Sequence, residues 1–218
     1  MTESELVSSP KREIAIPIDR TEAEVLKTLE ACGVSKRYLS ASMDDIDPKL
    51  RQSFLHAKNE SYFLWGNPGT GKTHLVSAIV AEIVRSAPPK HIYEDGRLKA
   101  VVLPQYPSLI SVPDLLLEIR EAFRDGSQQT ESDIIDCYTT GIKSLILDDL
   151  GVEKTTDWSL QTLYSIIDRR YRDMRQTIIT SNLSLKGIAE KVGDRIASRI
   201  SEMCRVVELK GRDRRVKP

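Results

Sequence analysis

The chain has 218 residues, of which 40% are hydrophobic and 29% charged, and its 32 basic residues balance 32 acidic ones. This length fits one large α/β domain, or one domain with a short appendage, and is too short for two ordinary domains with a linker. The apolar content excludes a disordered chain, and no apolar run approaches the ~18 residues of a membrane span. Zero net charge means that any contact with nucleic acid must rest on local patches. We therefore expect a soluble globular protein.

The cysteines and the amino terminus indicate a compartment. Cys32, Cys137 and Cys204 are odd in number, far apart and without CxxC spacing, which favours reduced thiols over disulfides or a zinc site. The first twenty residues lack the apolar stretch of a signal peptide. We expect a cytoplasmic protein.

The amino-terminal segment is predicted to be a loose polar leader over residues 1–20, followed by a short helix. Thr21 and Glu24 form a predicted capping box, and Gly33 ends the helix. The apolar residues of this helix could dock in a groove of a partner, or they could pack on the main domain. They are Val25, Leu26 and Leu29.

Strands and helices alternate through the rest of the chain, apart from a turn-rich insertion predicted between Ala87 and Pro107. This alternation predicts βαβ units and a parallel sheet with helices on both faces. The predicted strands are Ser61–Trp65, Leu109–Val112, Ser144–Leu147, Thr177–Thr180 and Arg205–Leu209.

A glycine-rich loop joins the first predicted strand to a helix and matches G-x-x-x-x-G-K-[ST]. Its residues are Gly66, Asn67, Pro68, Gly69, Thr70, Gly71, Lys72 and Thr73. Glycines let backbone amides curl around phosphate oxygens, and the helix amino terminus adds partial positive charge. We expect Lys72 to reach the β and γ phosphates and the Thr73 hydroxyl to ligate Mg²⁺. His74 follows directly and is included among the predicted nucleotide contacts. A plain glycine turn, the alternative, has no use for Lys and Thr at these positions.

Polar residues also follow the two strands Ser144–Leu147 and Thr177–Thr180. The first strand ends in Asp148 and Asp149, and two carboxylates there are costly unless metal or hydrogen bonds satisfy them. We assign Asp148 to Mg²⁺, through its water shell, and Asp149 to polarising the attacking water. Asn182, after the second strand, is a candidate sensor of the γ phosphate, although Ser-Asn is also a common turn.

Arg195 and Arg199 lie four residues apart on one face of a predicted helix. An arginine supplied to the γ phosphate of a neighbouring subunit can raise the hydrolysis rate by ~10³–10⁵, so such a chain would hydrolyse ATP only when assembled. The alternative is a solvated face with ion pairs to Glu190 or Glu202. The residues alone leave both open.

Taken in order, four segments resemble the AAA+ ATPases of the DnaC/DnaI helicase-loader and IstB transposition-helper group. They are GNPGTGKTH, SLILDDLGVEKTTDW, TIITSNLS and DRIASRISEMCRVVELKG. The resemblance covers about Tyr38 to Arg214, so we expect a leader with one helix at residues 1–37 and an AAA+ ATPase domain at residues 38–218. It implies a five-stranded sheet of order 5-1-4-3-2, ATP with Mg²⁺, assembly through shared ATP sites, and single-stranded DNA or a helicase as partner. It also makes Arg199 the arginine finger, with Arg195 as the near alternative.

Two departures from the wider AAA+ pattern accompany this resemblance. AAA+ proteins generally carry Asp-Glu where this chain has Asp148-Asp149, which suits slow turnover in a switch. The sequence stops at Pro218, soon after the last predicted strand, so we expect no helical lid, as in the loader and IstB group.

For DNA, the resemblance draws attention to two groups of residues. Basic residues end the helix after the second motif and recur in the tail from Arg205 to Pro218, although such runs are usually solvated faces. In that helix they are Arg169, Arg170, Arg172 and Arg175. Phe123 and Tyr138 are predicted as base-stacking residues.

We therefore expect an ATP-dependent AAA+ switch in DNA replication that loads a replicative helicase onto single-stranded DNA and uses hydrolysis for release. An IstB-like helper that assembles on DNA to direct a transposase is the alternative within the family. Two readings of other classes are a phosphate-loop kinase acting on a small acceptor and a non-hydrolysing ATP-binding scaffold.

Overall fold

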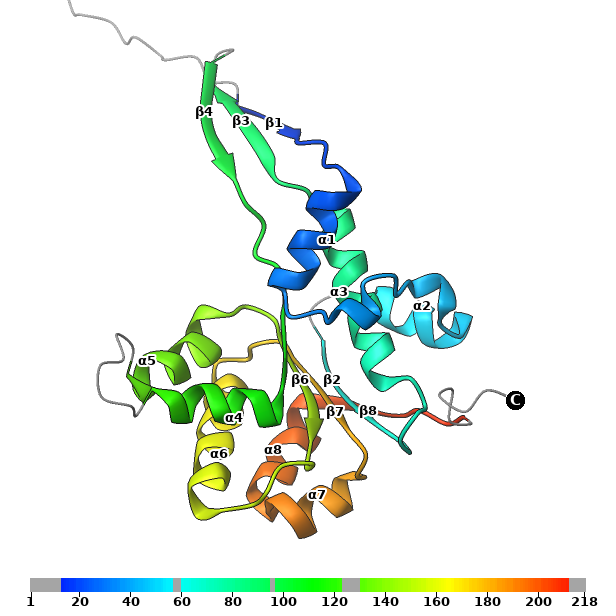
Figure 1. Cartoon of the computed structure of the whole chain (residues 1–218), viewed down its shortest axis with the longest axis vertical. Coiled ribbons are helices and arrows are strands. Elements are labelled where there is room, and N and C mark those ends of the chain that lie inside the picture. Colours follow the sequence, from blue (N-terminus) through cyan, green and yellow to red (C-terminus); the bar gives the residue numbers. More distant parts are fainter. Residues whose placement is uncertain (1–12, 57–59, 95–96, 123–129, 212–218) are drawn as a thin grey trace, which may run out of the picture.

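The computed structural model describes residues 13–56, 60–94, 97–122 and 130–211. Its centre is a five-stranded parallel sheet in the order β5-β6-β7-β2-β8 (Figure 1). The strands are β2 (Ser61–Trp65), β5 (Ser108–Ser111), β6 (Leu145–Leu150), β7 (Thr177–Ser181) and β8 (Cys204–Glu208). Numbered among themselves in chain order, they run 2-3-4-1-5, which is 5-1-4-3-2 from the opposite edge. The predicted sheet and its order are confirmed.

Helices cover both faces of this sheet, because alternate residues of its strands are apolar in both directions. Ile146 of β6 is buried with α1 and α3 on one face, whereas Leu145 and Leu147 are buried with α4 to α8 on the other. The helices are α1 (Glu22–Ala31), α2 (Pro48–His56), α3 (Lys72–Ser86), α4 (Val112–Glu121), α5 (Glu131–Asp136), α6 (Asp157–Arg172), α7 (Leu185–Val192) and α8 (Asp194–Met203). None of the described helices is both long and apolar enough to cross a membrane.

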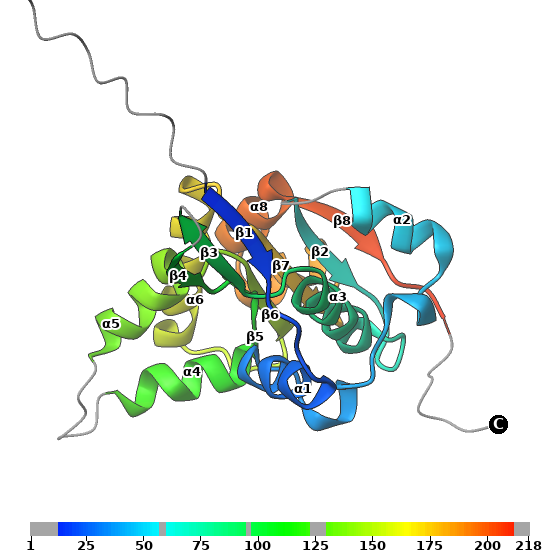
Figure 2. The same cartoon turned by 90° about the horizontal axis from the view of Figure 1, so that it is seen from above.

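The amino-terminal helix α1 packs on its own chain. The predicted capping box between Thr21 and Glu24 is present, and Val25 and Leu29 are buried beside α3 (Figure 2). Gly33 follows the helix with φ +90°, and a Cβ there would lie 1.8 Å from the carbonyl oxygen of Leu109. The Leu109 N–H donates to the carbonyl of Cys32 at 2.8 Å. The end of α1 is therefore fastened to the edge strand β5.

A second, three-stranded antiparallel sheet rises from the body in the order β1-β3-β4 (Figure 1). Its strands are β1 (Glu13–Pro17), β3 (Lys90–Glu94) and β4 (Arg97–Val102). Here the predictions of a loose leader and a turn-rich insertion are wrong for residues 13–17, 90–94 and 97–102. All six residues of β4 are exposed, so this strand is held by its pairing with β3 and not by burial on the body. Residues 1–12 lie outside the described part of the chain.

Candidate nucleotide-binding site

The loop from Gly66 to Thr73 joins β2 to α3 and keeps the amino terminus of α3 open. Gly69 and Gly71 have φ values of 80° and 94°, in the left-handed region that a side chain would strain. Gly71 is the N-cap of α3, and no side chain caps it. The amides of the first helical turn therefore remain available to an anion, as a phosphate loop requires.

Lys72 is buried within this loop. Its ammonium group donates to the carbonyl oxygens of Gly66 at 2.7 Å and Asn67 at 3.0 Å, and the residue is 5% exposed. These bonds hold the cation inside the turn of the loop. Thr70 closes the loop by donating its hydroxyl to the Asn67 carbonyl at 2.9 Å.

Thr73 on α3 and Asp148 on β6, the two residues predicted to hold Mg²⁺, are hydrogen-bonded to each other. The Thr73 hydroxyl donates to Oδ2 of Asp148 at 2.9 Å, and the Thr180 hydroxyl on β7 donates to Oδ1. Asp148 is 7% exposed, and this burial raises its pKa above the ordinary value. The hydrogen bond from Thr180 opposes this rise in pKa, whereas the nearby charge of Asp149 adds to it.

The donors present fit Mg²⁺. Thr73 and Asp148 supply one hydroxyl and one carboxylate, both oxygen donors, beside a loop shaped for phosphates. Mg²⁺ usually keeps several waters and takes only one or two carboxylates together with substrate phosphates.

A cavity of about 520 Å³ opens between the loop and the carboxyl ends of the strands. This volume lies within the usual range for small-molecule sites. The structure brings eight of the predicted residues to its wall: Pro68, Gly69, Gly71, Lys72, Thr73, His74, Asp149 and Asn182. The Asp149 N–H donates to the Thr180 hydroxyl oxygen at 2.9 Å, which fixes the backbone that carries this second acid. Asp149 itself adopts φ +59°, unusual for a residue other than glycine.

Sequence reasoning missed the opposite wall of the cavity. Arg37, Tyr38 and Asp45 line it, and they come from two short helical turns at Lys36–Tyr38 and Met43–Asp45. The predicted contact His74 lies between them, with its ring edge-on to Tyr38 at 6.3 Å and its Nε2 3.5 Å from the Asp45 carboxylate. The only signal for this wall was the start of the family resemblance near Tyr38.

Glu153 was also missed, although it shapes the loop after the two acids. Its carboxylate accepts the N–H of Gly151 at 2.8 Å, and the residue is 7% exposed. Gly151 has φ +89°. This bond closes the turn that leads away from Asp149, and Val152 in the same turn lines the cavity.

The two predicted finger arginines lie away from the nucleotide cavity of their own chain. Arg199 on α8 donates through Nε to Asp168 on α6 at 2.9 Å. Arg195 and Arg199 line a separate surface hollow with Tyr164, Asp194 and Ser198. Neither arginine lines the cavity that contains Lys72 and Asp149.

Two of the residues predicted to contact DNA are buried, and those two predictions are wrong. Arg170 is fully buried and Tyr138 is 8% exposed with its hydroxyl donating to Glu118 at 2.8 Å, so neither forms a basic or stacking surface. Arg169 pairs with Asp136 at 2.7 Å and Arg172 with Asp168 at 3.0 Å, which leaves little of the patch uncompensated. Phe123 and residues 212–218 of the tail lie outside the described residues.

Arg170 instead joins three segments of the domain. Burial lowers its pKa to about 10. Its guanidinium donates to the Thr177 hydroxyl at 2.9 Å and to backbone carbonyls that precede β6 and β7. The carbonyls within 3.1 Å are those of Tyr138, Ile142, Lys143 and Gln176.

A parallel sheet in this order, with a phosphate loop after its first strand and paired acids in the carboxyl-terminal half of its third, defines an AAA+ ATP-binding protein. The family model for "IstB-like ATP binding protein" matches residues 105–218. The chain belongs to this family.

The chain is similar to two kinds of named protein, one from a phage-like element and one a replicative helicase loader. The chain is 27% identical over 152 residues to "Phage-like element PBSX protein XkdC" of Bacillus subtilis, covering 67% of this chain and 48% of that protein. It is 26% identical over 186 residues to "Replicative helicase loader DnaC" of Buchnera aphidicola subsp. Acyrthosiphon pisum, covering 80% and 68% respectively. The chain spans about half the length of several other curated relatives, among them the DnaC proteins of Escherichia coli and of Buchnera aphidicola subsp. Baizongia pistaciae.

A solved structure supports the same grouping. The crystal structure of the DnaC helicase loader matches with a TM-score of 0.63 and 25% identity. The match covers 81% of this chain and all of that one.

Proposed function

We propose that the chain is an ATP-dependent AAA+ switch that loads a replicative helicase onto single-stranded DNA, with ATP hydrolysis driving release. Its family and the likeness to DnaC loaders support the client. The single observation that supports ATP chemistry is the Thr73–Asp148 hydrogen bond, which places a metal-binding pair beside Lys72. A cytoplasmic setting goes with this function.

In this proposal, each of these residues has a separate role in the hydrolysis of ATP to ADP and phosphate. Lys72 binds the β and γ phosphates, and Asp149 orients the attacking water from the wall of the same cavity. Asn182 donates to that water or to a γ-phosphate oxygen. Thr73, and Asp148 through the water shell of the ion, would hold Mg²⁺, which would supply charge neutralisation on the phosphates. Asp149 is shorter than the usual glutamate, which suits a slow enzyme.

Hydrolysis depends on assembly in this proposal. Arg199, with Arg195 as the alternative, lies outside its own nucleotide cavity and would serve the γ phosphate of a neighbouring copy. ATP sites shared between copies then couple turnover to assembly on DNA or on the helicase. The division at residues 37 and 38 stays part of the proposal. Because Val25 and Leu29 are buried on α3, docking by residues 1–37 would use other surfaces of that segment.

The family match favours one second candidate, an IstB-like ATPase that assists a transposase on DNA. It uses the same ATP site and differs in its client. Co-purification with a replicative helicase and with a transposase, each in ATP and in ADP, separates the two. We expect ATP-dependent capture of the helicase; capture of the transposase alone would select the second candidate.

Calorimetry with magnesium and ATP tests the site itself. We expect heat of binding for the folded chain and none for Lys72→Ala, whose unfolding transition should remain cooperative. Phosphate release should then rise when helicase or single-stranded DNA is added. A chain that binds ATP but turns it over only with a small acceptor would be a phosphate-loop kinase, and the proposed switch would be wrong.

A further inference from the structure

The guanidinium of Arg199 is held by side chains of α6 and α8. Its Nε donates to Oδ1 of Asp168 at 2.9 Å, and its Cζ lies 4.6 Å from the ring centroid of Tyr171. Glu202 is 4.0 Å from Nη1. Arginine is thus fixed both in its plane, by a charged hydrogen bond, and across its face, by an aromatic ring.

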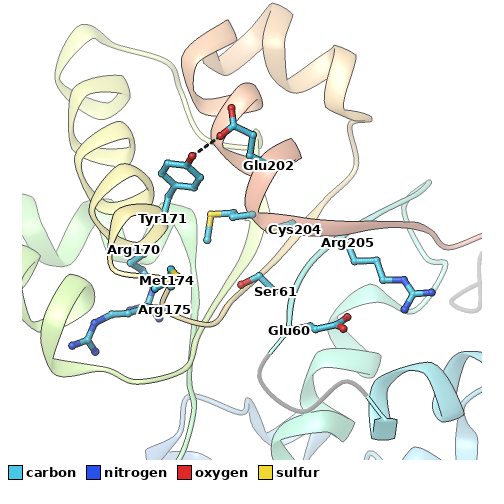
Figure 3. A pocket seen from close by; sticks show the side chains of 10 residues that line it. Glu60, Ser61, Arg170, Tyr171, Met174, Arg175, Glu202, Cys204 and Arg205 are labelled. Carbon is cyan, nitrogen blue, oxygen red and sulfur yellow. Dashed lines mark hydrogen bonds between the residues drawn. The ribbon is translucent and has the colours of Figure 1, made fainter.

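The residues that hold Arg199 are themselves fixed. The Tyr171 hydroxyl donates to Glu202 at 2.5 Å, as the dashed line in Figure 3 shows. The Asp168 side chain is 13% exposed, and its other oxygen accepts from Nε of Arg172 at 3.0 Å. The arrangement is therefore a small network built from one face of α6 and the facing side of α8.

The atom that Asp168 binds matters for what Arg199 can do. Arginine presents five N–H donors in a planar fork, and the bond to Asp168 uses Nε. An arginine fixed at Nε still carries two terminal nitrogens that can bind a phosphate. Arg195, one turn earlier on α8, is exposed and has no hydrogen bond or ion pair to another described residue. Of the two arginines, only Arg199 is held in one orientation before a neighbour arrives.

We propose that Asp168 is the positioning residue of the arginine finger: with Tyr171 as the flat support, it orients the Arg199 guanidinium toward the nucleotide of a neighbouring copy. This inference rests on the proposed function, because it assumes that Arg199 acts in trans. Fixing the side chain in advance removes rotamer freedom that would otherwise be lost in the transition state. Asp168 touches neither nucleotide nor metal in this arrangement.

The first test compares stimulated ATP hydrolysis by the assembled full-length chain in Asp168→Ala, Arg199→Ala and the double variant. We expect Asp168→Ala to lower kcat about 10-fold to 30-fold with KM for ATP unchanged, because the residue lies outside the nucleotide cavity. The double variant should be no slower than Arg199→Ala alone. Additive losses would show that Asp168 acts independently of Arg199 and would overturn the inference.

A matched control is Arg85→Ala, which removes a surface ion pair between α3 and Glu22 and does not touch Arg199. It should keep the stimulated kcat within about two-fold, as for a surface pair. Tyr171→Leu provides a second variant if Asp168→Ala unfolds, since it removes the ring support and keeps apolar volume. We expect it to lower kcat with KM unchanged; full activity in this folded variant would overturn the inference.

Mixing subunits separates failure of the inference from failure of the proposed function. Lys72→Ala subunits have an intact finger, whereas Arg199→Ala and Asp168→Ala subunits have an intact ATP site. Adding Lys72→Ala subunits to either should restore hydrolysis. If Arg199→Ala hydrolyses ATP normally when assembled, the trans finger is wrong; if Arg199→Ala is slow but Asp168→Ala is normal, only the positioning role is wrong.

Discussion

The hydroxyl of Thr180 on β7 donates to the Asp148 carboxylate on β6 and accepts the backbone N–H of Asp149. One side chain thus fixes both acids of the nucleotide site. It does so from the neighbouring strand, 31 to 32 residues away in sequence.

Replacing Thr180 with valine should lower both stability and hydrolysis. The shape is kept, but a buried carboxylate loses a donor and a buried N–H loses its acceptor, which costs about 1–3 kcal/mol in the free energy of unfolding. Urea unfolding measures this cost. Thr139→Val, at an equally buried threonine away from the cavity, is the matched control for activity. Full hydrolysis by the folded Thr180→Val protein would contradict the role assigned to this hydroxyl.

Because burial raises the pKa of Asp148, ionisation of this carboxyl should lower the free energy of unfolding of the nucleotide-free protein, by an amount that depends on pH. A carboxyl with a folded-state pKa above its unfolded value makes the folded state less stable as pH rises through that interval, because ionisation is opposed by burial. Asp148→Asn removes the ionisation. We expect it to raise the free energy of unfolding at pH 7 and to lose this advantage as pH falls through the ordinary pKa range of a carboxyl. Thermal unfolding across that pH range, without nucleotide, is the measurement; a variant less stable than wild type at pH 7 would refute the prediction.

Arg170 should act on stability and not on a DNA surface. Arg170→Met leaves the carbonyls before β6 and β7 without their donor, so we expect a loss of about 3 kcal/mol or more in unfolding free energy. Arg169→Ala, at the exposed neighbouring position, should change stability by less than about 1 kcal/mol. Denaturant unfolding of the two variants tests this contrast, and equal losses would argue against it.

Tyr38 should contribute to binding the nucleotide through its base or ribose, because it lies beside His74 on the cavity wall that carries neither Lys72 nor Asp149. Tyr38→Ala is expected to weaken binding of ATP and ADP equally, by about 10-fold, which is the loss of one aromatic contact. Calorimetry with each nucleotide measures the ratio. A selective loss for ATP would instead place Tyr38 near the γ phosphate.

The sequence predicted strands best where a strand is an unbroken run of buried apolar residues. β2, β6 and β7 are short apolar runs between turns, and each was predicted within a few residues. β4 was missed because it lies in a stretch that has prolines on both sides, and its six residues are all exposed and add nothing to the main core. Packing against the rest of the chain does not decide such a strand; pairing with β3 does.

The site residues also differ in how well the sequence predicts them. Lys72 and Thr73 are set by a local motif, whereas Thr180 and Glu153 act through contacts whose partners are chosen by the fold. Arg170 was misassigned because it stands among other arginines. Its spacing of three residues from buried Ile167 placed it on the apolar stripe of α6, and that signal was readable.

Because α1 packs on α3 and β1 pairs with β3, the amino-terminal residues cannot be removed without exposing other parts of the domain. A chain trimmed to begin at residue 38, where the family resemblance starts, would lose the cover that Val25 and Leu29 give to α3 and would lose the outer strand of the small sheet. The remaining two-stranded hairpin is marginal in water, and the bared helix face would invite aggregation. Expression trials for this protein should therefore start upstream of Glu13.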